Sequence, residues 1–118
     1  LKLSLKFKLK IIEDAAEEVG SFYKKKHLGT FGDIGCFSFN GNKIITTGGG
    51  GAVVTNNNYL AKKIKHLANT AKVKHKWEYI HDDIGFNFKM PSLNAALGLA
   101  QIKKIDIFLK AKRKLFYN

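Results

Sequence analysis

The sequence contains few cysteines and no long apolar run. Cys36 is the only cysteine among 118 residues, so the chain can form neither an internal disulfide nor a zinc site built on several cysteines. The four histidines are not spaced like metal ligands, and we expect no metal site. No apolar stretch reaches the length of a membrane span, and no stretch has the pattern of a signal peptide. We therefore expect a cytoplasmic protein without a membrane partner.

Arginine is almost absent, although the formal net charge is +12. Arg113 is the only arginine, and lysines supply the remaining positive charge. Proteins that recognise nucleic-acid bases in a groove usually use arginine, so this charge is weak support for nucleic-acid binding. We expect no nucleic-acid partner, and a basic nucleic-acid-binding module remains an alternative.

The N-terminal third of the sequence predicts two strands, the second of which ends at acidic residues. Apolar and polar residues alternate over 1–9, which predicts a half-exposed strand. Residues 9–12 predict a short buried strand that ends at Glu13 and Asp14, and 14–20 predict a short helix. The carboxyl ends of strands are where α/β sheets bind ligands, so these acids are candidates for a site.

The rest of the chain predicts further strands and helices, and an apolar share of 45% over 118 residues is enough to bury a sizeable core. The expected elements are an irregular hairpin over 21–35, a strand over 34–40, a strand over 52–55, a helix over 59–71, a long loop over 72–90, a helix from Pro91 or Ser92, and a final basic helix. Side chains of Asn56 to Asn58 are suited to cap the helix over 59–71.

One group of residues in the sequence suggests a binding or catalytic site. Asp14 ends a strand, Ser38 lies 24 residues later, Lys43 lies five residues beyond it, and four glycines occupy 48–51. The stretch lacks the Gly-Lys-Ser/Thr of a nucleotide phosphate loop and the spaced glycines of a dinucleotide fold. Pyridoxal phosphate needs a carboxylate for its ring nitrogen, small donors for its phosphate and a lysine amine, which these residues would supply.

The stretches "IIEDAAE", "FGDIGCFSFNGNKIITTGGGGAVVTNN" and "IGFNFKMPSLNAALGLAQIKKID" resemble the DegT/DnrJ/EryC1/StrS aminotransferases, over about 11–118. The resemblance implies a pyridoxal-phosphate-dependent enzyme that moves an amino group, from glutamate, to a nucleotide-linked keto sugar. It implies that Asp14 pairs with the ring nitrogen, Ser38 binds the cofactor phosphate, and Lys43 is the catalytic lysine that bonds to the cofactor. Lysine at 43 also favours amino transfer over dehydration, since histidine replaces it in the dehydrating branch.

The resemblance further implies a homodimer in which Asn87 reaches the phosphate of the neighbouring subunit. Glu17 lies where many members have glutamine against the ring, and it joins the expected cofactor-binding residues. Gly49 and Lys89 depart from the glutamate and arginine that are common at their positions. These three departures leave the sugar undetermined.

The expected fold is part of the large α/β domain of a type I pyridoxal-phosphate-dependent transferase of the aspartate aminotransferase kind. The resemblance also implies that 1–7 are the end of a helix before the strand over 9–12, in place of the strand that the alternation predicts. The resemblance implies that 1–118 is a partial large domain truncated at both ends, without the N-terminal segment and the C-terminal small domain. An inactive fragment is therefore the second alternative.

Overall fold

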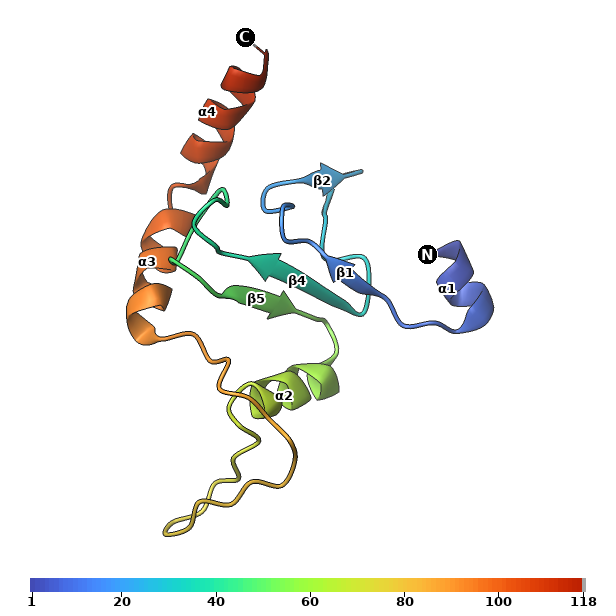
Figure 1. The fold of residues 1–118 in the computed structure, drawn as a ribbon. Helices are drawn as coiled ribbons and strands as arrows, with labels where there is room; N and C mark the ends of the chain where they lie inside the picture. Colours follow the sequence, from blue (N-terminus) through green and yellow to red (C-terminus); the bar gives the residue numbers. More distant parts are fainter. Residues whose placement is uncertain (118) are drawn as a thin grey trace.

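The computed structural model describes residues 1–117 (Figure 1). The elements in chain order are α1 (Lys2–Phe7), β1 (Ile12–Asp14), β2 (Phe22–Tyr23), β3 (Lys26–His27), β4 (Ile34–Ser38), β5 (Gly51–Val54), α2 (Asn58–Leu67), α3 (Ser92–Ile102) and α4 (Ile105–Tyr117).

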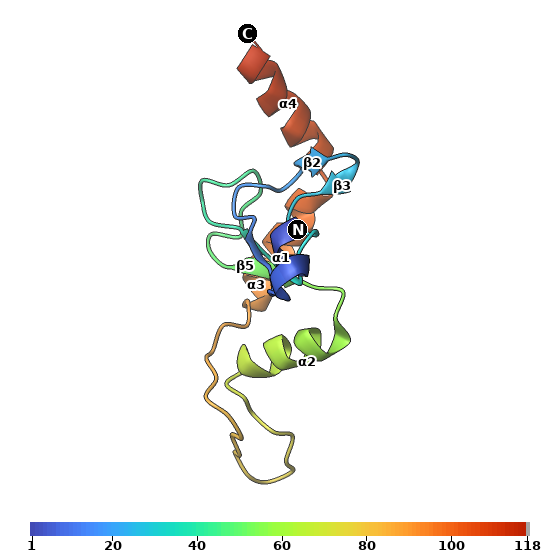
Figure 2. The same ribbon diagram turned by 90° about the vertical axis from the view of Figure 1, so that its right-hand side faces the viewer.

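A three-stranded sheet lies at the centre, in the order β1-β4-β5 (Figure 1). β1 runs parallel to β4, with Asp14 opposite Cys36, and β5 runs antiparallel to β4, with Gly51 opposite Ser38. The antiparallel pair needs only a loop to join it, whereas the parallel pair needs the longer crossover that 15–33 supply. The same crossover contains the β2–β3 hairpin, which confirms the expected hairpin (Figure 2).

The helices that follow the sheet begin where local signals predict. The Asn57 side chain accepts hydrogen bonds from the N–H groups of Tyr59 and Leu60, at 2.9 and 3.2 Å, and so caps α2. Pro91 directly precedes α3, where its missing N–H costs nothing. Between α2 and α3 the long loop extends away from the sheet (Figure 2).

Two local predictions are wrong. The alternating residues 1–9 contain helix α1 rather than a strand, as the family resemblance implies. Of the predicted helix over 14–20, Asp14 belongs to β1 and residues 15–20 form two consecutive turns. The N–H of Gly20 donates to Nε2 of His27 at 2.9 Å, and Arg113 donates to the Gly20 carbonyl at 3.0 Å. Backbone hydrogen bonds close the turns locally, from Glu18 to Ala15 and from Ser21 to Glu18, and the two partners of Gly20 hold the end of the segment from outside it.

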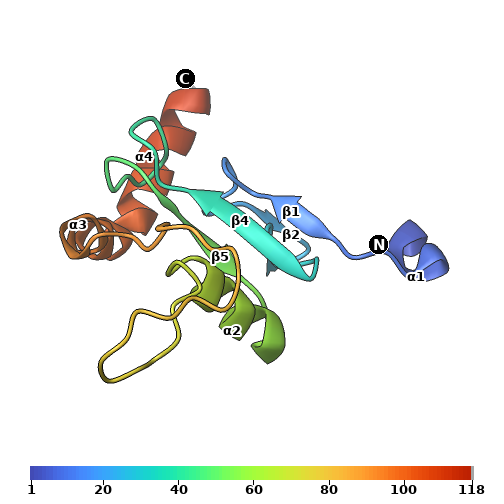
Figure 3. The ribbon, with the colours of Figure 1, turned by 60° about the horizontal axis from the view of Figure 1, so that its bottom comes forward.

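The described chain buries little apolar surface, which contradicts the expected core. Within residues 1–117, the buried apolar side chains are Ala15, Ile45 and Ala71. The helices lie around the ends and one edge of the sheet rather than across its faces (Figure 3), and the dimensions are 59 × 43 × 18 Å. The radius of gyration is 17.2 Å, whereas a compact chain of this length has about 13–14 Å. No helix within 1–117 is long and apolar enough to cross a membrane.

Candidate active site

Asp14 and Ser38 are the last residues of the neighbouring parallel strands β1 and β4, so they lie at the same end of the sheet. Asp14 is exposed, and its Oδ1 accepts a hydrogen bond from the N–H of Ala16 at 3.2 Å. Within residues 1–117 no lysine, arginine or histidine forms an ion pair with this carboxylate. Asp14 can therefore receive a cationic group of a ligand.

The Ser38 hydroxyl is arranged to donate. Its Oγ accepts a hydrogen bond from the N–H of Asn40 at 3.3 Å, which leaves the hydroxyl hydrogen free for an anionic oxygen. The period of two in β4 places Ser38 and Cys36 on the same face. Cys36 is a half-buried free thiol.

Lys43 lies in the loop that leaves β4, and its side chain is largely shielded from solvent. The exposed fraction of the Lys43 side chain is 13%, against 71% for its ion-pair partner Glu17. The Lys43 ammonium donates to Oε1 of Glu17. Since Glu17 follows Asp14 by three residues, this pair brings the lysine of the β4–β5 loop to the turn after β1.

Helix α3 holds the lysine loop in place. The N–H of Thr46 donates to the Gln101 side-chain oxygen at 2.9 Å, and the Asn94 amide donates to the Thr47 carbonyl at 2.5 Å. A Cβ added to Gly98 would lie 2.7 Å from the Thr47 side chain, so the helix backbone passes close to the loop. These contacts span about fifty residues and have no local signal in the sequence.

The glycine run is required at some positions and not at others. Gly50 has a φ of +90°, a conformation that favours glycine. A Cβ added to Gly51 would lie 2.2 Å from the Phe37 carbonyl oxygen, in the facing strand. Gly49 has no atom within 4 Å of such a Cβ, so the structure explains why another residue type is compatible there.

Asn87 does not join the other predicted residues. It lies in the long loop with an exposed side chain and forms an isolated backbone bridge with Asn69, just beyond α2. An ion pair, Lys63–Asp83 at 2.9 Å, and a hydrogen bond between His66 and Asp82 at 2.5 Å join α2 to this loop nearby in the sequence. Within residues 1–117 the Asn87 side chain forms no hydrogen bond with Asp14, Ser38 or Lys43.

Glu13, a strand-end acid that the sequence groups with Asp14, has contacts that sequence reasoning did not assign. Its carboxylate accepts hydrogen bonds from three N–H groups of the turn before β4, those of Gly29, Phe31 and Gly32. Burial by itself would raise the pKa of Glu13, but the three backbone hydrogen bonds and the Lys26 charge outweigh it and hold the pKa below its usual value. The only available signal was the position of Glu13 beside Asp14 at a strand end.

The donor set has the chemistry of a site for pyridoxal phosphate: an unpaired carboxylate, a hydroxyl free to donate and a shielded primary amine. Within residues 1–117 no three histidine, cysteine or acidic side chains are grouped to hold a metal ion.

Comparison with known proteins identifies the family. The chain is 47% identical over 105 residues to the GDP-perosamine synthase of Escherichia coli O157:H7, and 45% identical over 107 residues to that of Vibrio cholerae. These alignments cover 89% and 91% of the chain, but 29% of each relative.

The structure of Helicobacter pylori PseC, an aminotransferase involved in the biosynthesis of pseudoaminic acid, superposes with a TM-score of 0.85 at 38% identity. The superposition covers 90% of this chain and 29% of PseC. The fold is therefore the α/β fold of part of a sugar aminotransferase. Because the sequence model of the DegT/DnrJ/EryC1/StrS aminotransferase family matches residues 1–117, the chain belongs to that family.

Proposed function

We propose that this chain is part of the large domain of a pyridoxal-phosphate-dependent aminotransferase that transfers an amino group from glutamate to a nucleotide-linked keto sugar. The observation that carries the proposal is the placement of Asp14, Ser38 and the Lys43–Glu17 pair around one end of the sheet. The names of the relatives, among them GDP-perosamine synthase, support an activated sugar as the acceptor.

Each residue has a distinct role in this proposal. When bound, pyridoxal phosphate supplies an electron sink that stabilises negative charge at the carbon bearing the amino group. Asp14 keeps the proton on the ring nitrogen, and the Ser38 hydroxyl donates to a phosphate oxygen. Lys43 Nζ removes and returns the proton at the reacting carbon, for which a shielded amine is suited.

Glu17 and Asn87 have secondary roles. The Glu17 carboxylate orients the Lys43 amine, since the two side chains are in contact. The Asn87 side chain is exposed and is not hydrogen-bonded to the other site residues, which suits an amide that binds the cofactor phosphate of a second subunit. The proposed assembly is therefore a homodimer.

The test replaces Lys43 in the complete protein that contains these 118 residues, loaded with pyridoxal phosphate; the term full chain means this protein from here on. We expect Lys43→Ala to abolish turnover, to remove the visible absorbance of the bound cofactor and to prevent borohydride from attaching the cofactor to the protein. Lys62→Ala, at an exposed position of α2, is the matched control and should retain all three properties. Turnover or trapping that survives in Lys43→Ala would contradict the proposal.

A further inference from the structure

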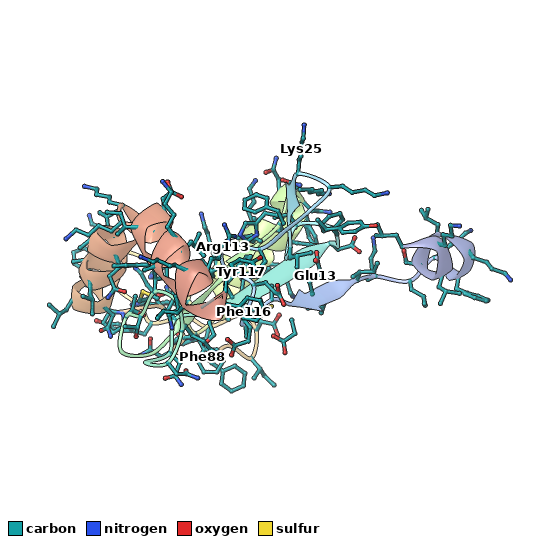
Figure 4. The ribbon with its side chains drawn as sticks, turned by 90° about the horizontal axis from the view of Figure 1, so that it is seen from above. Glu13, Lys25, Phe88, Arg113, Phe116 and Tyr117 are labelled. Atoms are coloured by element: carbon teal, nitrogen blue, oxygen red, sulfur yellow. The ribbon has the colours of Figure 1, made fainter. Side chains whose placement is uncertain are left out.

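Glu13 binds a turn rather than a ligand. Its Oε2 accepts from the N–H of Gly29 at 2.9 Å, and its Oε1 accepts from Phe31 and Gly32 at 2.5 and 2.6 Å. Figure 4 shows Glu13 at β1, on the side of the molecule where the crossover passes. A half-buried carboxylate with three main-chain donors is a strong and directional contact, because the acceptor is charged.

This contact joins three segments. In β1 Glu13 pairs with Gly35 of β4, and the turn that Glu13 binds passes directly over Gly35. A Cβ added to Gly35 would lie only 1.8 Å from the Gly29 carbonyl oxygen. β1, the turn and β4 therefore form one closely packed unit with the Glu13 carboxylate at its centre.

This unit is directly joined to the candidate site, because Glu13 immediately precedes Asp14 in the sequence. Glu13 and Asp14 are consecutive in β1, so their side chains point to opposite faces of the sheet. A shift of β1 against β4 would move Asp14 relative to Ser38, because the two residues end the paired strands.

A second carboxylate provides an internal comparison. Asp33 accepts from the N–H of Ile11 at 2.9 Å and pairs with Lys10 at 3.2 Å. It therefore fastens the same two strands at the beginning of β1, at the end away from Asp14. Glu13 lies next to Asp14 and accepts from three main-chain N–H groups, whereas Asp33 binds the chain just before β1 through one main-chain N–H and the Lys10 side chain.

We propose that Glu13 is a positioning residue that holds Asp14 in place to keep the cofactor ring nitrogen protonated. The inference rests on the proposed function. Asp33 stabilises the same strand pair without this effect on the ring nitrogen.

The experiment compares Glu13→Gln with Asp33→Asn in the full chain loaded with pyridoxal phosphate that carries ¹⁵N in its ring. The glutamine keeps the shape of the side chain but turns an amide donor toward backbone N–H groups. We expect both variants to unfold at lower urea concentrations. Only Glu13→Gln should move the ring-¹⁵N resonance toward that of the unprotonated ring, with turnover reduced by up to about 100-fold, as expected for a displaced group.

An unchanged ring-¹⁵N resonance in a destabilised Glu13→Gln would overturn the inference and leave Glu13 a purely structural residue. Equal resonance shifts in both variants would also overturn it. If Glu13→Gln does not fold, Glu13→Asp, which keeps the charge and shortens the reach, is judged by the same resonance. Failure of the unmodified chain to take up pyridoxal phosphate would instead overturn the proposed function, and the inference with it.

Discussion

The strand region, 12–55, and the region of helices and loop, 58–117, are held together differently. In the strand region, side chains of Glu13, Asp33 and Thr55 bond to backbone groups of other segments. In the second region, large apolar side chains are highly exposed, among them those of Trp77, Tyr79, Ile84, Leu93 and Phe116. The geometry of the site therefore depends on directional polar contacts more than on a buried core, since those contacts specify which strands and turns lie together.

Among the variants that test this comparison, we expect the largest change in turnover from replacing a carboxylate of the strand region. We expect Asp14→Asn to lower turnover by about 10²–10³-fold, because the amide no longer stabilises the positive ring nitrogen. Glu17→Gln should cost less than about tenfold, since the Glu17 side chain is 71% exposed and such ion pairs are weak. Steady-state kinetics of the full chain provide the measurement. Comparable losses from the two variants would show that Asp14 is not the residue that pairs with the ring nitrogen.

A second pair of variants compares two glycines within the strand region. Gly35→Ala should lower the free energy of unfolding by about 2 kcal/mol or more, because the new methyl group meets backbone that cannot move independently. Gly49→Ala should change it by less than about 0.5 kcal/mol, as at an open surface position. Urea unfolding of the full chain measures both, and equal effects would show that the turn over Gly35 is not rigid.

Acid should remove the stabilisation that Glu13 provides. Because its pKa is lower in the folded chain than its ordinary value of 4.5, this contribution is fully present above that pH. It is lost as the pH falls through the lower pKa of the folded state. The difference in urea midpoint between the unmodified chain and Glu13→Gln should therefore narrow below about pH 4.5, and a difference that widens in acid would contradict the sign of the shift.

The smallest expected effect lies in the second region. The Asp83 carboxylate has a lowered pKa because of its hydrogen bond to Lys63, but both side chains are about half exposed. Asp83→Asn should increase protease cleavage within 72–90 only slightly, and high salt should remove the difference by screening. A large, salt-independent increase would show that the long loop is anchored as firmly as the strand region.

Local patterns predicted the elements whose determinants are local. The alternation in β4, the cap at Asn57 and the proline before α3 each led to an element that the structure contains. Alternation over 1–9 was misleading because a short Leu/Lys pattern is compatible with strand and helix. The turns over 15–20 are also held through Gly20 by His27 and Arg113, and the contact with Arg113, 93 residues away, has no local signal.

The sequence by itself determined the family, because the stretches that contain Asp14, Ser38 and Lys43 together resemble it, and it predicted the chemistry of the candidate site. Only the tertiary structure decided which groups position them. Glu13 binds a turn 16–19 residues away, and the lysine loop is held by Asn94 and Gln101 of α3. Such contacts depend on how the strands and helices are placed in space, and the spacing of residues along the chain does not encode that placement.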